Sequence, residues 1–93
     1  MQKAHEMMES QEVAIVDIRD AASFEQGHIL NAQNINDQNI KNFLDLTDRS
    51  IPILCYCYHG NSSQQASVFF ANQGFGNVYS IDGGWGEWSE VYG

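Results

Sequence analysis

Three short apolar runs place the strongest limit on how this chain of 93 residues can fold. They lie at residues 13–18, 51–56 and 78–81 and contain the β-branched residues typical of buried strands. The stretches between them, including residues 21–26 and 63–73, carry apolar residues at helical spacing. Strands that alternate with helices are joined by right-handed crossovers. The sequence therefore predicts an α/β fold with a mainly parallel sheet and helices on both faces.

Several residues predict where the helices begin and end. Asp20 is expected to cap a short helix at residues 21–26, and Gly27 is expected to end it. Further helical spacing occurs at residues 2–9 and 40–44, whereas residues 31–36 predict an irregular or short extended piece.

The helix expected at residues 63–73 is preceded by Ser62, which has the spacing of a capping box with Gln65. Its apolar residues Ala66, Phe69 and Phe70 are expected to face inward. After the third strand, two glycines turn the chain into a last short helix. Its residues Trp85 and Trp88 are expected to pack the core, while Glu87 and Glu90 are expected on the surface.

Size and charge limit the class of protein. Ninety-three residues suit a single domain, and the net charge of −8 argues against nucleic acid and anionic membranes as partners. Two cysteines separated by one residue cannot form a disulfide framework, so a reducing, cytoplasmic setting is expected. No leader and no apolar run of membrane-spanning length is evident.

The loop after the second strand run carries the candidate chemistry. Cys57 stands between a strand and a helix, where open α/β sheets bind their ligands. Gly60 and Asn61 readily take positive φ, so the loop can turn successive backbone N–H groups inward as an anion-binding nest. These donors and the helix dipole would lower the pKa of the Cys57 thiol and favour the nucleophilic thiolate. No basic side chain is required.

The residues alone leave two interpretations of Cys57 open, a reactive thiol or a small buried core residue. Cys55 lies within the apolar run and is expected in the core, with a resolving-thiol role as the lesser alternative. Ser63 stands where cysteine phosphatases need an arginine to clamp phosphoryl oxygens, which weighs against phosphatase chemistry. His59 and the two cysteines lack a second pair of ligands, so no metal is expected.

Three motifs together resemble the signatures of the rhodanese family and occur in the family's order. They are "VDIRDAASFEQGHILNA" at 16–32, "CYHGNSS" at 57–63 and "VYSIDGGWGEW" at 78–88. The resemblance covers nearly the whole chain and implies a rhodanese-like three-layer fold with a sheet of four to five strands. Residues 1–93 would form a single rhodanese domain, without the short strand that usually precedes the family's first helix.

The resemblance also implies an activity, that of a thiosulfate sulfurtransferase. Cys57 would cycle between thiol and persulfide, with thiosulfate as the donor and cyanide, thioredoxin or a small dithiol as the acceptor. By matching position, the loop's N–H donors would come from Tyr58, His59, Gly60, Asn61 and Ser62. No cofactor is implied. The alternative is a sulfur-carrier or persulfide-binding module with little turnover of thiosulfate.

Four other polar residues have simpler structural interpretations. Asp17 and Arg19 alternate at the end of the first strand and are expected to face different ways. Both are expected to tie neighbouring loops together, in preference to a role for Arg19 in guiding an anion. His28 is expected to make a structural hydrogen bond, and the side chain of His59 is expected to point outward.

Overall fold

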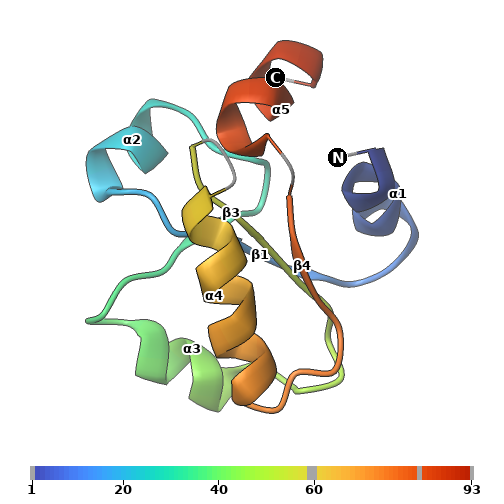
Figure 1. Ribbon diagram of the computed structural model, residues 1–93, viewed down its shortest axis with the longest axis vertical. Coiled ribbons are helices and arrows are strands. Elements are labelled where there is room, and N and C mark those ends of the chain that lie inside the picture. The colour runs from blue at the N-terminus through green and yellow to red at the C-terminus, as the bar shows by residue number, and fades with distance from the viewer. Residues whose placement is uncertain (1, 59–60, 82, 93) are drawn as a thin grey trace.

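The computed structural model describes residues 2–58, 61–81 and 83–92, and helices and strands alternate along them (Figure 1). The elements are, in order, α1 Gln2–Ser10, β1 Ala14–Asp17, α2 Ala21–Gln26, β2 Gln33–Asn34, α3 Ile40–Leu46, β3 Ile53–Tyr56, α4 Asn61–Asn72, β4 Val78–Ser80 and α5 Gly84–Val91. No helix in this described part of the chain is long and apolar enough to cross a membrane.

The four strands form one parallel sheet in the order β2-β1-β3-β4. In its register, Asp17 pairs with Tyr56 and Cys55 pairs with Ser80. The carboxyl ends of β1, β3 and β4 therefore lie along the same edge of the sheet. Residues far apart in the sequence meet at that edge.

Two apolar layers cover the two faces of the sheet, as expected for a three-layer α/β fold. On one face Ile15, Leu54 and Tyr56 pack with side chains from α1, α2 and α5, among them Trp88. On the other face the layer is built from the strands together with α3 and α4. Its buried members are Val16, Ile35, Phe43, Ile53, Cys55, Phe70 and Phe75. The predicted fold class is confirmed, and so is the packing of Trp85 and Trp88 against the core.

The short helix α2 begins and ends where the sequence predicts. The Asp20 carboxylate accepts a hydrogen bond from the Ser23 backbone N–H at 3.1 Å, which caps the first turn. Gly27 ends the helix with φ of 173°, which is extended backbone and not the left-handed region. The glycine is required for another reason. A Cβ at this position would lie 2.8 Å from the Trp85 ring.

The structure corrects two details of α4. The helix begins at Asn61, so Ser62 lies inside its first turn and the predicted capping box is wrong. Phe70 is buried, but Phe69 is 40 % exposed and does not face inward as predicted. Adjacent helical residues project about 100° apart, so both rings cannot point at the sheet. Phe69 instead packs against Phe70, with ring centroids 5.5 Å apart.

Candidate active site

Cys57 follows β3 directly and comes shortly before α4, at the carboxyl edge of the sheet. Its side chain is buried, with only 7 % of its surface exposed. The Sγ atom lies 3.7 Å from the hydroxyl of Ser63, in the first turn of α4. The sequence prediction that Cys57 stands between a strand and a helix is therefore confirmed.

The N-terminus of α5 holds the backbone that follows β3. The Trp85 N–H donates to the Cys57 carbonyl at 2.9 Å, and the Gly86 N–H donates to the Tyr58 carbonyl at 3.1 Å. The close approach requires Gly84, because a Cβ at this position would lie 2.3 Å from the Cys57 carbonyl oxygen. Two N–H groups that a helix cannot satisfy internally are used here to fix two loop carbonyls.

The predicted donor loop is only partly described. Tyr58 is exposed, whereas His59 and Gly60 lie outside the described residues. Asn61 and Ser62 form the start of α4, where backbone N–H groups have no partner within the helix. Whether these residues surround an anion therefore stays a prediction.

Cys55 is a core residue, as the sequence predicts. Its side chain is fully buried, and neither Cys55 nor Cys57 forms a disulfide. Burial raises the pKa of the Cys55 thiol from 9.0 to about 12. The Sγ atom lies 3.4 Å from the Ser63 carbonyl and 3.5 Å from the Tyr79 carbonyl, and the thiol donates to both. A neutral thiol held in this way is a poor nucleophile at neutral pH.

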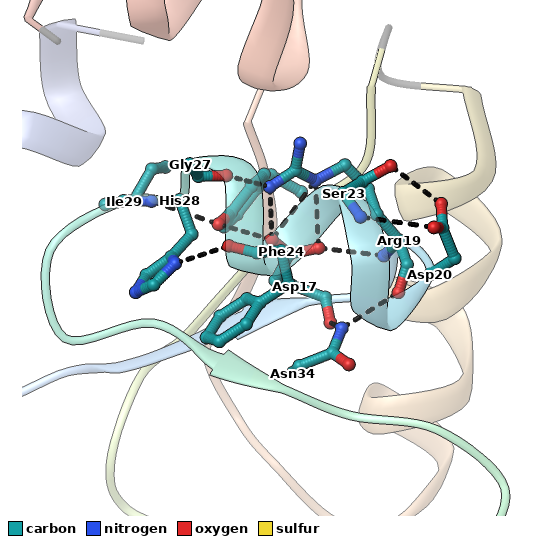
Figure 2. A network of polar contacts seen from close by, with 10 residues as sticks. Asp17, Arg19, Asp20, Ser23, Phe24, Gly27, His28, Ile29 and Asn34 are labelled. Atoms are coloured by element: carbon teal, nitrogen blue, oxygen red, sulfur yellow. Dashed lines mark hydrogen bonds and ion pairs between the residues drawn. The ribbon is translucent and has the colours of Figure 1, made fainter.

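Asp17 and Arg19 contact each other, so the prediction that they face different ways is wrong (Figure 2). The Arg19 guanidinium donates to both Asp17 oxygens at 2.8–3.1 Å and to the Gly27 carbonyl at 2.6 Å. Residues two positions apart on a strand point to the same face, so the spacing of Asp17 and Arg19 favours their contact, and β1 itself ends at Asp17. The predicted tying of neighbouring segments is confirmed, since the Arg19 side chain binds the Gly27 carbonyl after α2 and the Asp17 carboxylate accepts from the Tyr56 hydroxyl.

The pair of Asp17 and Arg19 is also bound to Tyr56, on the neighbouring strand β3. The Tyr56 hydroxyl donates to Asp17 at 2.7 Å and accepts from the Ile29 N–H at 3.1 Å. Burial, and then the hydrogen bond to Asp17, raise the pKa of Tyr56 above its ordinary value. Burial alone would lower the pKa of Arg19, but the hydrogen bonds and charge of Asp17 outweigh it and raise that pKa. Arg19 is thus part of the scaffold under the site.

His28 makes the structural hydrogen bond that was predicted. Its Nδ1 lies 2.7 Å from the Phe24 carbonyl, and its ring stacks on the Phe24 ring with centroids 3.8 Å apart. Glu87 and Glu90 are exposed, as expected for surface acids. Together with Tyr58 and Gly86 they line a cavity of about 560 Å³ that opens beside the residue following Cys57.

Sequence reasoning missed Ser80 and Gly84 as parts of the site. Ser80 ends β4, the strand next to β3, and its hydroxyl lies 2.5 Å from that of Ser63. The available signal was that Ser80 is a polar residue at the end of β4, next to the strand that leads to Cys57. It could be used only once the strand order was known. Within the described residues, no group of three or more His, Cys, Asp or Glu side chains could hold a metal ion.

Cys57 lies between a parallel strand and the N-terminus of a helix, and the N-terminus of a second helix binds its carbonyl. This arrangement defines a class of α/β proteins with a cysteine-centred loop. Residues 1–91 match the family model described as the rhodanese-like domain, and the chain belongs to this family.

Relatives of known name agree with this assignment. The chain is 47 % identical over 86 residues to the thiosulfate sulfurtransferase GlpE of Shewanella oneidensis, covering 92 % of this chain and 85 % of that protein. It is 40 % identical over 91 residues to GlpE of Pseudomonas putida, covering 98 % and 83 %. A human single-domain sulfurtransferase shares the fold with a TM-score of 0.85 at 17 % identity, covering all of this chain and 95 % of that one.

Proposed function

We propose that this protein is a thiosulfate sulfurtransferase that carries sulfur as a persulfide on Cys57. In the first half-reaction the Cys57 thiolate attacks the outer sulfur of thiosulfate. A new S–S bond forms on Cys57 as the old bond to the sulfonate sulfur breaks, and sulfite leaves with that bond's electron pair. In the second half-reaction an acceptor attacks the outer sulfur, and the Cys57 thiolate leaves. The cycle is of the ping-pong type.

The observation that carries this proposal is the placement of Cys57. Its Sγ atom lies buried at the carboxyl edge of the sheet, and α5 holds the carbonyls of Cys57 and Tyr58 through its own N–H groups. These two hydrogen bonds fix the backbone where the loop leaves β3. Relatives that are 40–47 % identical and are named for thiosulfate sulfur transfer support the same substrate class.

The backbone N–H groups of Tyr58 to Ser62 are proposed as the donors for the thiosulfate and persulfide charges. The first turn of α4 adds the positive end of its dipole. The carboxylates of Glu87 and Glu90 line the nearby cavity and oppose the approach of anions. Local N–H donors are therefore what an anionic donor substrate needs at this site.

The acceptor, the cellular setting and the extent of the domain belong to the same proposal. Cyanide would serve as an assay acceptor, and thioredoxin or a small dithiol as a biological one. Two cysteines that form no disulfide suit a reducing cytoplasm. Residues 1–93 are taken as one rhodanese domain.

The test is intact mass after the reduced protein is mixed with thiosulfate and then with cyanide or reduced thioredoxin. We expect a gain of one sulfur, about 32 Da, that maps to Cys57 and disappears with the acceptor. Cys57→Ser should lose both the gain and the turnover while keeping the fold. Cys55→Ala is the matched cysteine variant and should still load sulfur, because Cys55 is buried in the sheet. Turnover that survives Cys57→Ser would refute the proposal.

A further inference from the structure

A hydroxyl on α4 lies next to the Cys57 sulfur, and a second hydroxyl at the end of β4 lies next to the first. The Ser63 hydroxyl, on α4, is 3.7 Å from Cys57 Sγ, and the residue is fully buried. The Ser80 hydroxyl, at the end of β4, is 2.5 Å from the Ser63 hydroxyl. The three atoms form a short chain, Sγ to Oγ to Oγ, at the carboxyl edge of the sheet.

A chain of two hydroxyls can reverse its direction when the sulfur changes charge. With a neutral thiol, the Cys57 S–H donates to Ser63 and the Ser63 O–H donates to Ser80. With a thiolate, both hydroxyls rotate, so that Ser80 donates to Ser63 and Ser63 donates to the sulfur. Each state keeps both contacts hydrogen-bonded, which matters because an unsatisfied hydroxyl is costly to bury.

The surrounding charges make such a donor useful. The ionisable side chains described on β3, the loop, β4 and α5 are Cys55, Tyr56, Tyr58, Tyr79, Glu87 and Glu90, and none of them is basic. At the end of β1, which pairs with β3, Asp17 and Arg19 form an ion pair with each other. These described side chains therefore offer the Cys57 thiolate no uncompensated positive charge. A hydroxyl that donates to sulfur stabilises the anion without a cation.

We propose that Ser63 is a further catalytic residue, whose hydroxyl donates a hydrogen bond to the Cys57 sulfur whenever that atom carries negative charge, and that Ser80 is the positioning residue that orients it. This inference rests on the proposed function, since it assigns a role to Ser63 in both sulfur-transfer steps.

The hydrogen bond acts at the reacting atom in each half-reaction. Before the first step it increases the fraction of Cys57 present as thiolate, at some cost in the intrinsic nucleophilicity of that thiolate. In the second step the bond between Cys57 Sγ and the outer sulfur breaks, and the electron pair goes to Sγ. The Ser63 hydroxyl then stabilises the departing thiolate, and the outer sulfur leaves on the acceptor. No oxidant or reductant beyond the two substrates is needed.

The first test measures Cys57 ionisation without using thiosulfate. The rate of alkylation of Cys57 by iodoacetamide is followed against pH, with the modified residue identified by peptide mass. Ser63→Ala should move the midpoint of this profile upward by about one pH unit, which is the scale expected for one hydrogen bond to a charged group. Ser80→Ala should move it upward by less, because Ser63 keeps its own hydroxyl. Ser67→Ala, one turn further along α4 where its hydroxyl donates to the Gln64 carbonyl, should leave it unchanged.

The second test restores the hydroxyl and measures the acceptor step. Ser63→Thr should return the midpoint toward the wild-type value, whereas a loss caused only by packing would not be rescued. In single-turnover experiments, the pre-formed persulfide of Ser63→Ala should transfer sulfur to cyanide about tenfold more slowly at every pH.

An unchanged midpoint in a folded Ser63→Ala protein would overturn the inference. If that variant does not fold, an unchanged midpoint in Ser80→Ala overturns it. Failure of the wild-type protein to take sulfur from thiosulfate would instead refute the proposed function, and the alkylation profiles would still report on the hydrogen bond.

Discussion

Arg19 illustrates how the environment of a single residue decides its role. A cation near a predicted anion site would be expected to bind substrate. The Arg19 guanidinium is instead bound to Asp17 and to the Gly27 carbonyl (Figure 2). Its side chain is 5 % exposed, and its guanidinium carbon lies 5.1 Å from the centroid of the Trp85 ring. Because the Trp85 N–H binds the Cys57 carbonyl, Arg19 supports the site from behind.

The Tyr56 hydroxyl is the central contact of this buried network, and its removal gives the prediction at this scale. Tyr56→Phe leaves the buried Ile29 N–H without its acceptor and takes one donor from Asp17. We expect a loss of about 1–3 kcal/mol in the free energy of unfolding, measured by urea denaturation. Tyr92→Phe is the matched control. It removes the same group from a side chain that is 39 % exposed, and should change stability by less than about 0.5 kcal/mol.

Equal shifts of the urea midpoint in the two variants would show that the buried hydroxyl has no special role. Sulfur loading of Tyr56→Phe gives a second reading. It should persist, because the Tyr56 hydroxyl acts on the scaffold through Asp17 and Ile29.

At the scale of elements, the junction between β4 and α5 matters most for the site. Gly83 has φ of +75° and Gly84 has φ of +56°, backbone values that residues with a side chain rarely adopt. These two residues bring the first N–H groups of α5 onto the carbonyls of Cys57 and Tyr58. The turn is thus built to place a helix terminus against the loop.

Gly84→Ala tests this junction. The added Cβ would lie 2.3 Å from the Cys57 carbonyl oxygen, so α5 must move away from the loop. We expect a loss of about 1–3 kcal/mol in unfolding free energy, together with slower sulfur loading from thiosulfate. Gly76→Ala is the control, because nothing lies within 4 Å of its Cβ. Loading by Gly84→Ala at the wild-type rate would mean that the loop does not depend on α5.

The elements also show how far sequence alone could reach. Apolar runs and helical spacing located β1, β3, β4 and the helices, and Asp20 marked the start of α2 correctly. The start of α4 was misplaced, because serine at the right spacing satisfies the capping-box pattern equally well inside a first turn. When the length of the preceding loop is unknown, the local pattern does not distinguish a serine at the N-cap from a serine inside the first turn.

For the whole molecule, the alternation of strands and helices was sufficient to predict the sheet and its two apolar layers. It was not sufficient for the site. The contact of Ser63 with Ser80 joins residues that are 17 positions apart in the sequence. The contact of Asp17 with Tyr56 joins residues that are 39 positions apart. Strand order and register bring these residues together, and neither can be derived from spacing along one sequence.

The burial of Cys55 in the middle of the sheet makes the stability of the folded protein depend on pH in the alkaline range. Burial raises the pKa of Cys55 from 9.0 to about 12, so the folded state keeps a proton that the unfolded chain has lost above about pH 9. Stability is therefore fully present below pH 9 and falls as the pH rises from 9 toward 12. The slope from this one group is at most about 1.4 kcal/mol per pH unit.

Cys55→Ala isolates that contribution. The variant should be less stable than the wild type at pH 7, since it loses a packed side chain in the sheet. The difference should shrink as the pH is raised, because the variant lacks the thiol whose ionisation favours unfolding. Urea unfolding at pH 7, 9, 10 and 10.5 with reductant present would show the two stability curves converging above pH 9. Tyr56, whose raised pKa acts in the same direction, is common to both proteins and cancels in the comparison. Parallel curves over this range would mean that Cys55 ionises as readily in the folded protein as in the unfolded chain, contrary to its complete burial.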